Sequence, residues 1–323
     1  MKRIVAHRHG GPEVLQLEEV EPPSPGPGEA LIRQHAIGLN FIDTYHRSGL
    51  YPLPLPFVPG LEGAGVVEAT GDGVTALKAG DRVAYGAGPV GAYAESRVMP
   101  ANRLARLPDA VDFESAAALM LKGLTAWYLL RETYRVKAGD VIVFLPAAGG
   151  VGLIAGQWAK ALGAVSIGVC AAAKADLAGA AGYDHVIAYD EEEDYAARVR
   201  ELTDGAGAAV VYDGVGAATF TRSLDCLKRR GLMVSFGNAS GPVTGVDLGV
   251  LAQKGSLYLT RPMLMDYVAG DADLARAHAE LLDMVAAGKL RADIGQRYAL
   301  ADAARAHADM EARRTVGQSI LLP

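Results

Sequence analysis

A glycine-rich turn between an apolar run and a helical pattern carries the clearest chemical signal in the sequence. In "FLPAAGGVGLIAGQWAKALGA", residues 144–164, a proline ends the apolar run and three glycines follow. A turn without side chains can approach a pyrophosphate closely, and the helix after it offers unpaired N–H groups at the positive end of its dipole. We therefore predict that Gly149 and Gly150 bind the phosphates of a dinucleotide.

The glycine spacing departs from the usual dinucleotide fingerprint at one position. In the G-x-G-x-x-G pattern, Ala147 takes the first place, Gly149 the second and Gly152 the third. A tight structural turn is the alternative interpretation of such a motif taken alone. The strand expected before the motif and the helix expected after it favour the nucleotide site.

The acidic residue that usually completes this fingerprint, about 20 residues further on, is missing. The next apolar run ends at Cys170 with no acid beside it, and Asp176 lies too deep in the following helix. Lys174 stands where it could meet a ribose 2′-phosphate, which favours NADPH over NADH. An ordinary solvated lysine on a helix face is the alternative.

Short apolar runs alternate with helical patterns from residue 141 to residue 260. The expected strands are Val141–Phe144, Ser166–Cys170, His185–Ala188, Val210–Asp213, Leu232–Phe236 and Ser256–Thr260. The expected helices are Val151–Leu162, Ala173–Ala181, Tyr195–Leu202 and Thr219–Arg229. The alternation is typical of βαβ units, and six strands match a doubly wound parallel sheet of the Rossmann type. The fold class is therefore α/β.

Small residues follow two of the expected strands. Because ligands of open parallel sheets bind outside the carboxyl ends of the strands, these residues are candidates for the nicotinamide end of the cofactor. They are Phe236, Gly237, Asn238 and Ser240. Asp213, at the end of the other strand, is predicted to be a buried turn or cap residue rather than a catalytic one.

The two ends of the chain follow a different pattern. The first third is rich in glycine and proline and contains short strand-like segments broken by turns. Residues 112–134 predict two helices divided near Lys122–Gly123. After Arg261, amphipathic helical patterns lead to a terminal strand, "GQSILLP". This tail has the wrong order to extend the parallel sheet, and we expect it to return to the N-terminal β unit.

The composition limits the classes of protein. A chain of 323 residues exceeds the usual size of one hydrophobic core, so we expect two domains. The net charge of −6, without a basic stripe, disfavours nucleic acid and anionic membranes as partners. No run reaches the roughly 20 apolar residues of a membrane span, and "MKRIVAHRHGGPEVLQ" lacks a signal-peptide core. Two distant cysteines argue against a disulfide framework, so we expect a cytoplasmic protein.

Several longer motifs carry a family resemblance. They are "HGGPEVLQ" at 9–16, "GLNFIDTYHRSGLYP" at 38–52, "KAGDRV" at 78–83, "LKGLTAWYLL" at 121–130, "GGVGLIAGQWAKALGA" at 149–164 and "SLDCLKRRGLMVSFGNASG" at 223–241. The match covers nearly the whole length. The chain resembles the quinone oxidoreductases of the zeta-crystallin type, in the zinc-free branch of the medium-chain dehydrogenase/reductase superfamily.

The resemblance implies an architecture and a partner. A GroES-like, β-rich catalytic domain would be built from residues 1–122 and 263–323, with a Rossmann NADPH-binding domain at 123–262 between them. The cofactor would lie in the cleft between the two domains. The family also implies a homodimer joined through the edges of the Rossmann sheets, with "SLYLT" as the edge strand.

The resemblance further implies which residues contact the cofactor. They are Thr125, Val151, Lys174, Tyr189, Phe236, Gly237, Ser240 and Arg313. Lys174 and Arg313 would hold the 2′-phosphate. The segment "CAAAK" lacks the Ser or Thr that often precedes this lysine, so the preference for NADPH could be weaker than in relatives. Pro146 stands where the family usually has alanine, which removes a backbone donor at a strand end.

Two positions argue against a catalytic zinc. Zinc-dependent relatives use a cysteine and the histidine of a "GHE" motif, and the corresponding residues here are Asn40 and Leu61. A three-ligand zinc site cannot be assembled there, so we expect no metal. Hydride transfer to a quinone develops charge on an oxygen joined to an aromatic ring. Delocalisation spreads that charge, and a few hydrogen-bond donors suffice to stabilise it.

The candidate catalytic residues follow from these positions. Asn40, Tyr45 and Tyr51 lie in the matching N-terminal segment, and Arg261 follows the last expected Rossmann strand. We expect them to position the ring and stabilise the oxyanion while NADPH carries the redox step, giving a hydroquinone or a semiquinone. The alternative is that the tyrosines merely line the pocket.

Three functions therefore stay open at the level of sequence. The first is an NADPH-dependent quinone reductase. The second is an NADPH-dependent reductase of α,β-unsaturated ketones or aldehydes, a neighbouring activity in the same branch. The third is an NADPH-binding protein without enzymatic activity or an RNA-binding protein, which the charge disfavours. The tyrosines of residues 41–52 weakly favour a flat aromatic acceptor.

Overall fold

The computed structural model describes residues 1–192 and 194–323. The chain forms two compact units. Unit 1 combines Met1–Leu124 with Val268–Pro323, and unit 2 is Thr125–Tyr267. From the sequence we expected the domain boundaries after residues 122 and 262. The compact units of the structure divide after residues 124 and 267.

Unit 2 is built on a six-stranded sheet in which every neighbouring pair is parallel, in the order β10-β9-β8-β11-β12-β13. The strands are β8 (Val141–Leu145), β9 (Val165–Cys170), β10 (His185–Ala188), β11 (Ala208–Asp213), β12 (Leu227–Ser235) and β13 (Tyr258–Thr260). The predicted Rossmann-type sheet is confirmed. Apolar runs such as Val141–Leu145 form these strands because both faces of the sheet are covered.

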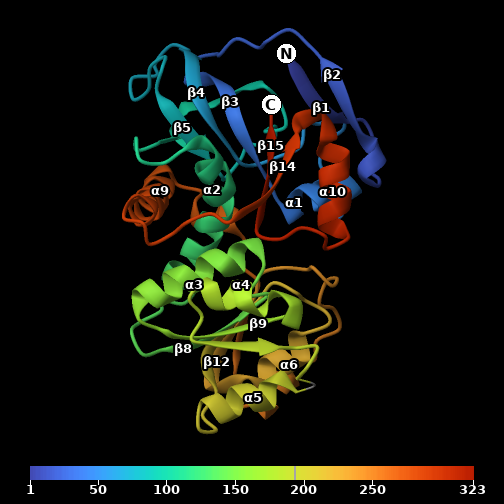
Figure 1. Cartoon of the computed structure of the whole chain (residues 1–323), viewed down its shortest axis with the longest axis vertical. Coiled ribbons are helices and arrows are strands. Elements are labelled where there is room, and N and C mark those ends of the chain that lie inside the picture. Colours follow the sequence, from blue (N-terminus) through green and yellow to red (C-terminus); the bar gives the residue numbers. More distant parts are fainter. Residues whose placement is uncertain (193) are drawn as a thin grey trace. The chain divides into compact units, whose positions relative to one another are not determined.

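Helices cover both faces of this sheet. The helical segments of unit 2 are η3 (a π-helical turn, Tyr128–Thr133), α3 (Gly150–Leu162), η4 (Ala172–Lys174), α4 (Ala175–Ala180), α5 (Tyr195–Leu202), α6 (Phe220–Asp225), α7 (Gly249–Gln253) and α8 (Leu264–Tyr267). Helices α3 and α4 pack together on one face, and α5 and α6 pack together on the other (Figure 1). Val143, Ile167 and Val211 are fully buried between these layers. Each such side chain contributes about 1.5–3 kcal/mol of burial free energy.

The strand order reverses at β8. The chain runs from β8 outward to β9 and β10, and then returns to the opposite side of β8 with β11. Ligands of doubly wound sheets bind outside the carboxyl ends of the strands at such a reversal. The glycine turn directly follows β8, so the topology places it at the expected ligand position.

Unit 1 is built on a seven-stranded sheet, in the order β14-β15-β3-β4-β5-β7 with β6 also paired to β3. A separate two-stranded ribbon pairs β1 with β2. The strands are β1 (Lys2–Ala6), β2 (Leu15–Glu19), β3 (Glu29–Leu39), β4 (Gly63–Thr70), β5 (Arg82–Tyr85), β6 (Ser96–Pro100), β7 (Ala105–Arg106), β14 (Ile294–Ala299) and β15 (Gln318–Leu322). Strand β15 pairs antiparallel with β3, with Ile320 opposite Gly38. The C-terminal tail therefore enters the sheet begun by the N-terminal third, and Figure 1 shows β14 and β15 beside β3.

The helical segments that begin in unit 1 surround this sheet. They are η1 (Pro12–Val14), α1 (Phe41–Ser48), η2 (Ala101–Arg103), α2 (Phe113–Trp127), α9 (Asp271–Ala286), η5 (Leu300–Asp302) and α10 (Ala303–Glu311). The expected break at Lys122–Gly123 is wrong, because α2 continues through it. A Cβ on Gly123 would lie 2.5 Å from Leu281 Cδ1 of α9. This glycine therefore permits close helix packing and does not end a helix.

The helix expected at Thr219–Arg229 is also too long. Helix α6 ends at Asp225 and β12 begins at Leu227, which pairs with Ala208 and is fully buried. The strand register then shifts, and Arg230 has a φ of 60°. The irregularity in β12 hides its start in the sequence, because the basic residues there resemble the end of a helix.

Replacing Gly152 should destabilise unit 2. A Cβ at this position would lie 2.2 Å from the carbonyl oxygen of Pro146 and 2.5 Å from that of Ala147. We expect Gly152→Ala to lower the free energy of unfolding by about 1–3 kcal/mol. The matched control is Gly179→Ala in α4, where the new Cβ has no described atom within 4 Å apart from the adjacent residues and the backbone of its own helix. Thermal unfolding followed by circular dichroism compares the two; equal stability would contradict the packing role of Gly152.

Candidate active site

The turn after β8 leaves its backbone open. Gly149 has extended backbone angles at the first position before α3, and its N–H donates to the carbonyl oxygen of Pro146 at 3.1 Å. A Cβ on Gly149 would lie 3.0 Å from Pro146 Cγ. A side chain at Gly149 would crowd Pro146 in this narrow turn. Glycine avoids that contact and leaves room for a ligand to approach the backbone. The turn and the start of α3 therefore fit a dinucleotide pyrophosphate.

The candidates for the adenosine side lie at the ends of β9 and β10. Lys174 ends the short helix η4, and Tyr189 follows β10 with 47% of its surface exposed. The Tyr189 N–H donates to the carbonyl oxygen of Cys170 at 3.0 Å, which holds the two strand ends together. Sequence reasoning missed Asp190, whose Oδ1 accepts the N–H of Ala172 at 2.8 Å.

The candidates for the nicotinamide side follow β12 and β13. The Phe236 ring packs on Phe144 with centroids 5.4 Å apart. Gly237 is required here because a Cβ would lie 2.4 Å from the carbonyl oxygen of Gly214. Arg261 Nη1 donates to the carbonyl oxygen of Phe236 at 3.0 Å. The structure thus brings Phe236, Gly237 and Arg261 together.

Two further polar residues, Ser240 and Asp213, hold the loops that follow β11 and β12. The Ser240 hydroxyl donates to the carbonyl oxygen of Val215 at 2.8 Å and accepts the N–H of Ala218 at 3.0 Å. The carboxylate of Asp213 accepts four hydrogen bonds and is fully buried. Its partners are Val215 N, Gly216 N, Thr219 Oγ1 and Ser223 Oγ. The predicted turn role of Asp213 is confirmed.

The acceptor candidates of unit 1 gather around α1. Asn40 precedes the helix and is buried, Tyr45 lies within it, and Tyr51 follows its end. The rings of Tyr45 and Tyr51 meet edge to face with centroids 5.3 Å apart. Phe41 lies 6.2 Å from Tyr45 between ring centroids and is 42% exposed. The segment therefore presents an aromatic cluster beside a buried amide.

A buried carboxylate that sequence reasoning missed orients this amide. Glu62 is fully buried, and its Oε2 accepts a hydrogen bond from Asn40 Nδ2 at 2.8 Å. The same oxygen pairs with Lys122 Nζ at 3.1 Å, and Oε1 accepts the N–H of Leu121 at 2.7 Å. A carboxylate only accepts, so the amide nitrogen of Asn40 must face it. A Cβ on Gly38 would lie 2.1 Å from Glu62 Oε2, so only glycine leaves room for this arrangement.

A second buried network joins α1 to α10. Arg47 pairs with Glu311 at 2.5 Å, and its Nη1 lies 3.3 Å from His307 Nδ1. Because a guanidinium only donates, His307 accepts at Nδ1 and carries its proton on Nε2. Nε2 then donates to Tyr93 Oη at 3.0 Å, and Tyr93 donates to Asp43 Oδ2 at 3.0 Å. Burial, with the nearby Arg47 charge, lowers the pKa of His307 to about 3, so the ring stays neutral.

Asp43 is the unusual acid of this network. Its side chain is fully buried, Oδ2 accepts the N–H of Asn40 at 2.9 Å, and Oδ1 has no hydrogen-bond partner among the described residues. Burial raises the pKa of Asp43 to about 7, against the lowering effect of the bonds from Asn40 and Tyr93. The residue holds the start of α1 and so acts on the position of Asn40. The spacing of Asn40 and Asp43 as helix cap and third residue was the available sequence signal.

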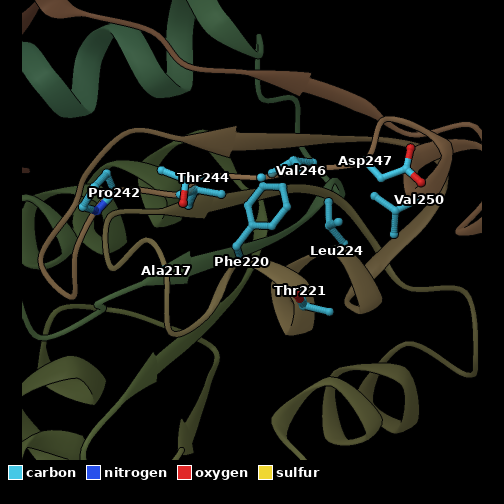
Figure 2. A pocket seen from close by; sticks show the side chains of 11 residues that line it. Ala217, Phe220, Thr221, Leu224, Pro242, Thr244, Val246, Asp247 and Val250 are labelled. Atoms are coloured by element: carbon cyan, nitrogen blue, oxygen red, sulfur yellow. The ribbon is translucent and has the colours of Figure 1, made fainter.

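A hollow in unit 2 lies away from the glycine turn. A pocket of about 320 Å³ lies between α6 and the segment 242–250. Figure 2 shows Phe220 and Leu224 of α6 on one side and Val246 and Val250 on the other. None of the predicted cofactor residues lines it. The pocket shares no residue with the glycine turn. The candidate cofactor site is therefore argued from the turn and its neighbours, and not from this pocket.

Comparison with known proteins places these features in a family. Residues 26–109 match the profile of the alcohol dehydrogenase GroES-like domain, and residues 150–276 match that of the zinc-binding dehydrogenases. The chain is 56% identical to the quinone oxidoreductase of Pseudomonas aeruginosa over 324 residues, covering 100% of this chain and 99% of that one. The chain belongs to the quinone oxidoreductase family.

Solved structures of relatives agree with this membership. The crystal structure of Escherichia coli quinone oxidoreductase complexed with NADPH is similar with a TM-score of 0.97 and 53% identity, over 100% of both chains. A 2-haloacrylate reductase of a Burkholderia species is 44% identical, covering 99% of this chain and 98% of that protein. The predicted combination of a GroES-like and a Rossmann domain is confirmed.

The name of one matched profile raises the question of zinc. Among the described residues, no group of three or more His, Cys, Asp or Glu side chains could hold a metal ion. Leu61 is buried and apolar where zinc-dependent relatives have histidine, and the amide nitrogen of Asn40 donates one hydrogen bond to Glu62. The donor set at these positions therefore does not fit a zinc ion.

The remaining predicted residues are placed as follows. Thr125 lies half-buried on α2, and Val151 lies in the first turn of α3. Arg313 lies in unit 1, exposed after α10, while Lys174 belongs to unit 2, so their joint role at a 2′-phosphate stays a prediction. His46 is buried, and burial lowers its pKa, as befits a packing residue.

Asp43 should make stability depend on pH. Its pKa is about 7 when folded against 3.8 ordinarily, so between these values the folded chain holds a proton that the unfolded chain releases. The contribution of Asp43 is full below pH 3.8 and is lost as the pH rises through 7. We expect the free energy of unfolding of the wild type, minus that of Asp43→Asn, to fall by up to about 1.4 kcal/mol per pH unit in this range.

Urea unfolding from pH 4.5 to 8 measures this difference. Asp72→Asn is the control, because it makes the same substitution at an exposed aspartate of unit 1. A difference between wild type and Asp43→Asn that stays constant with pH would show that Asp43 is ionised at all these pH values.

Proposed function

We propose that the protein is an NADPH-dependent quinone reductase that works without zinc. The observation that carries this proposal is the glycine turn at the strand-order reversal, in a chain that matches over its full length an enzyme solved with NADPH. The replacement of zinc ligands by Asn40 and Leu61 supports the metal-free chemistry.

The cofactor residues are assigned by the chemistry of their positions. Backbone at the turn binds the pyrophosphate, small residues after β12 face the nicotinamide, and basic residues hold the 2′-phosphate. The set is Thr125, Gly149, Gly150, Val151, Lys174, Tyr189, Phe236, Gly237, Ser240 and Arg313. NADPH, when bound, supplies the hydride.

The acceptor residues orient the quinone and stabilise the charge that develops on its oxygen. Asn40 donates through the amide hydrogen that Glu62 leaves available, and its position is fixed because Glu62 holds the other one. Tyr45 and Tyr51 present aromatic surface to a flat ring, and Arg261 adds positive charge. Hydrogen-bond donors fixed before the reaction stabilise an oxyanion without reorganising.

One relative supports a second candidate function. The similarity to a 2-haloacrylate reductase makes reduction of an electron-poor carbon–carbon double bond the alternative. Such a substrate also develops negative charge next to a carbonyl or carboxylate, so the same donors would serve it. The aromatic cluster of Phe41, Tyr45 and Tyr51 favours the planar quinone.

Comparison of acceptors tests the function directly. We expect NADPH oxidation with 1,4-benzoquinone or a naphthoquinone to be faster than with an α,β-unsaturated ketone. Asn40→Ala should lower kcat/KM for the quinone about 100-fold, because one oxyanion donor is lost. Asn102→Ala, an exposed asparagine of the same unit, is the control. Faster turnover of the ketone would favour the second candidate, and no turnover of either would leave a binding protein.

We also propose that the protein is a homodimer joined at β13. This strand ends the order of the six-stranded sheet, so among the described residues only β12 pairs with it. Tyr258 on β13 is 57% exposed, and Leu248 nearby in sequence is 70% exposed. A sheet edge with exposed apolar side chains favours pairing with a second copy.

A charge on this edge should separate the subunits. We expect Tyr258→Lys to shift the protein from dimer to monomer, because like charges would meet across the paired edge. Analytical ultracentrifugation measures the shift, with Leu55→Lys in unit 1 as a control that also replaces an exposed leucine by lysine. A dimer that persists in Tyr258→Lys would place the interface elsewhere.

The proposed location is the cytoplasm. Cys170 and Cys226 are free and buried thiols, which suits a reducing compartment. Among the residues that the structure describes, there is no helix with the length and apolar character needed to cross a membrane. The net charge of −6 supports a small-molecule substrate over a nucleic-acid partner.

A further inference from the structure

The strand pairing brings an aspartate to the adenosine side. Strands β9 and β10 are parallel, and Ala188 lies opposite Cys170 at their carboxyl ends. The residues that leave the two strands are therefore neighbours, and Asp190 Oδ1 accepts the N–H of Ala172 at 2.8 Å. The sequence has no acid at the end of β9, and the structure supplies one from the adjacent strand.

Lys174 and Asp190 carry opposite charges, and both act electrostatically on the thiol of Cys170. The thiol of Cys170, at the end of β9, has a pKa raised to about 11, mainly by burial. Asp190 raises this pKa further and Lys174 lowers it, so both charges lie close to the thiol. A phosphate bound by Lys174 would therefore also experience the field of Asp190.

We propose that Asp190 is a specificity-determining residue that weakens the preference of this protein for NADPH over NADH. The inference rests on the proposed role of Lys174 at the 2′-phosphate. A phosphate monoester carries nearly two negative charges, and a carboxylate at this position repels it. Asp190 also holds the Ala172 N–H that a phosphate oxygen could otherwise accept. Residues 171–173 are all alanine and offer no hydroxyl donors to compensate.

One substitution separates the charge of Asp190 from its structural contact. In Asp190→Asn the amide oxygen can still accept the Ala172 N–H, so the connection between the strand ends is kept. Only the negative charge is removed. Asp190 is exposed, so the change leaves the packing of unit 2 intact.

The experiment measures equilibrium binding and does not depend on turnover. NADPH and NADH are titrated into the wild type, Asp190→Asn and Lys174→Ala, and the fluorescence of the bound nucleotide gives each Kd. We expect Asp190→Asn to lower the Kd for NADPH about threefold and leave that for NADH unchanged. The gain should shrink when the titration is repeated in 0.5 M salt, because exposed charges are screened. Lys174→Ala should weaken NADPH more than NADH.

A neighbouring acid controls for total charge. Glu191→Gln removes the same charge one position along the chain, and it should change the ratio of the two Kd values less than Asp190→Asn. An unchanged ratio in Asp190→Asn, with Lys174→Ala still selective against NADPH, would overturn the inference and leave the cofactor site standing. If Lys174→Ala weakened the binding of NADPH and NADH equally, Lys174 would not bind the 2′-phosphate. The proposed role of Asp190 would then fail as well.

Discussion

The buried carboxylate of Glu62 is the interaction on which the arrangement of unit 1 depends. It receives hydrogen bonds from Asn40 before α1 and from Leu121 and Lys122 within α2. A fully buried charge is tolerated only when it is paired and hydrogen-bonded, so these partners cannot be exchanged freely. Strand β3 meets this requirement with Gly38, which leaves space for the carboxylate. The amide proposed to meet the quinone is thus fixed by electrostatics inside the core.

Unit 2 meets a different constraint, the close approach of backbone to the phosphate that we propose it binds. The glycines after β8 and the close contact of Gly237 with Gly214 keep side chains away from the ends of β8, β11 and β12. Asp213 stabilises the same edge by accepting backbone and hydroxyl hydrogen bonds. Close backbone packing therefore shapes the glycine turn of unit 2, while buried charges fix the candidate side chains of unit 1.

Local patterns in the sequence predicted the parts of the structure that local physics determines. The six strands of unit 2 were predictable because each is a short apolar run, and the turn because its glycines lie together. The break at Gly123 was wrong because the reason for that glycine, Leu281, lies far along the chain. Glu62 with Lys122, and Asp190 with Ala172, escaped detection because their partners are 60 and 18 residues apart in sequence. Only the folded chain brings such charges together.

The pairing of β15 with β3 has a consequence for synthesis. Residues 125–267 leave the ribosome as a continuous segment and contain every strand of their sheet. The other sheet is completed only when residues 318–322 emerge, because they form β15. Until then residues 37–39 of β3 lack the strand that pairs with them, and unpaired strand edges invite aggregation and chaperone binding. A chain that lacked residues 318–322 would keep every strand of the six-stranded sheet and would lack β15 in the other sheet.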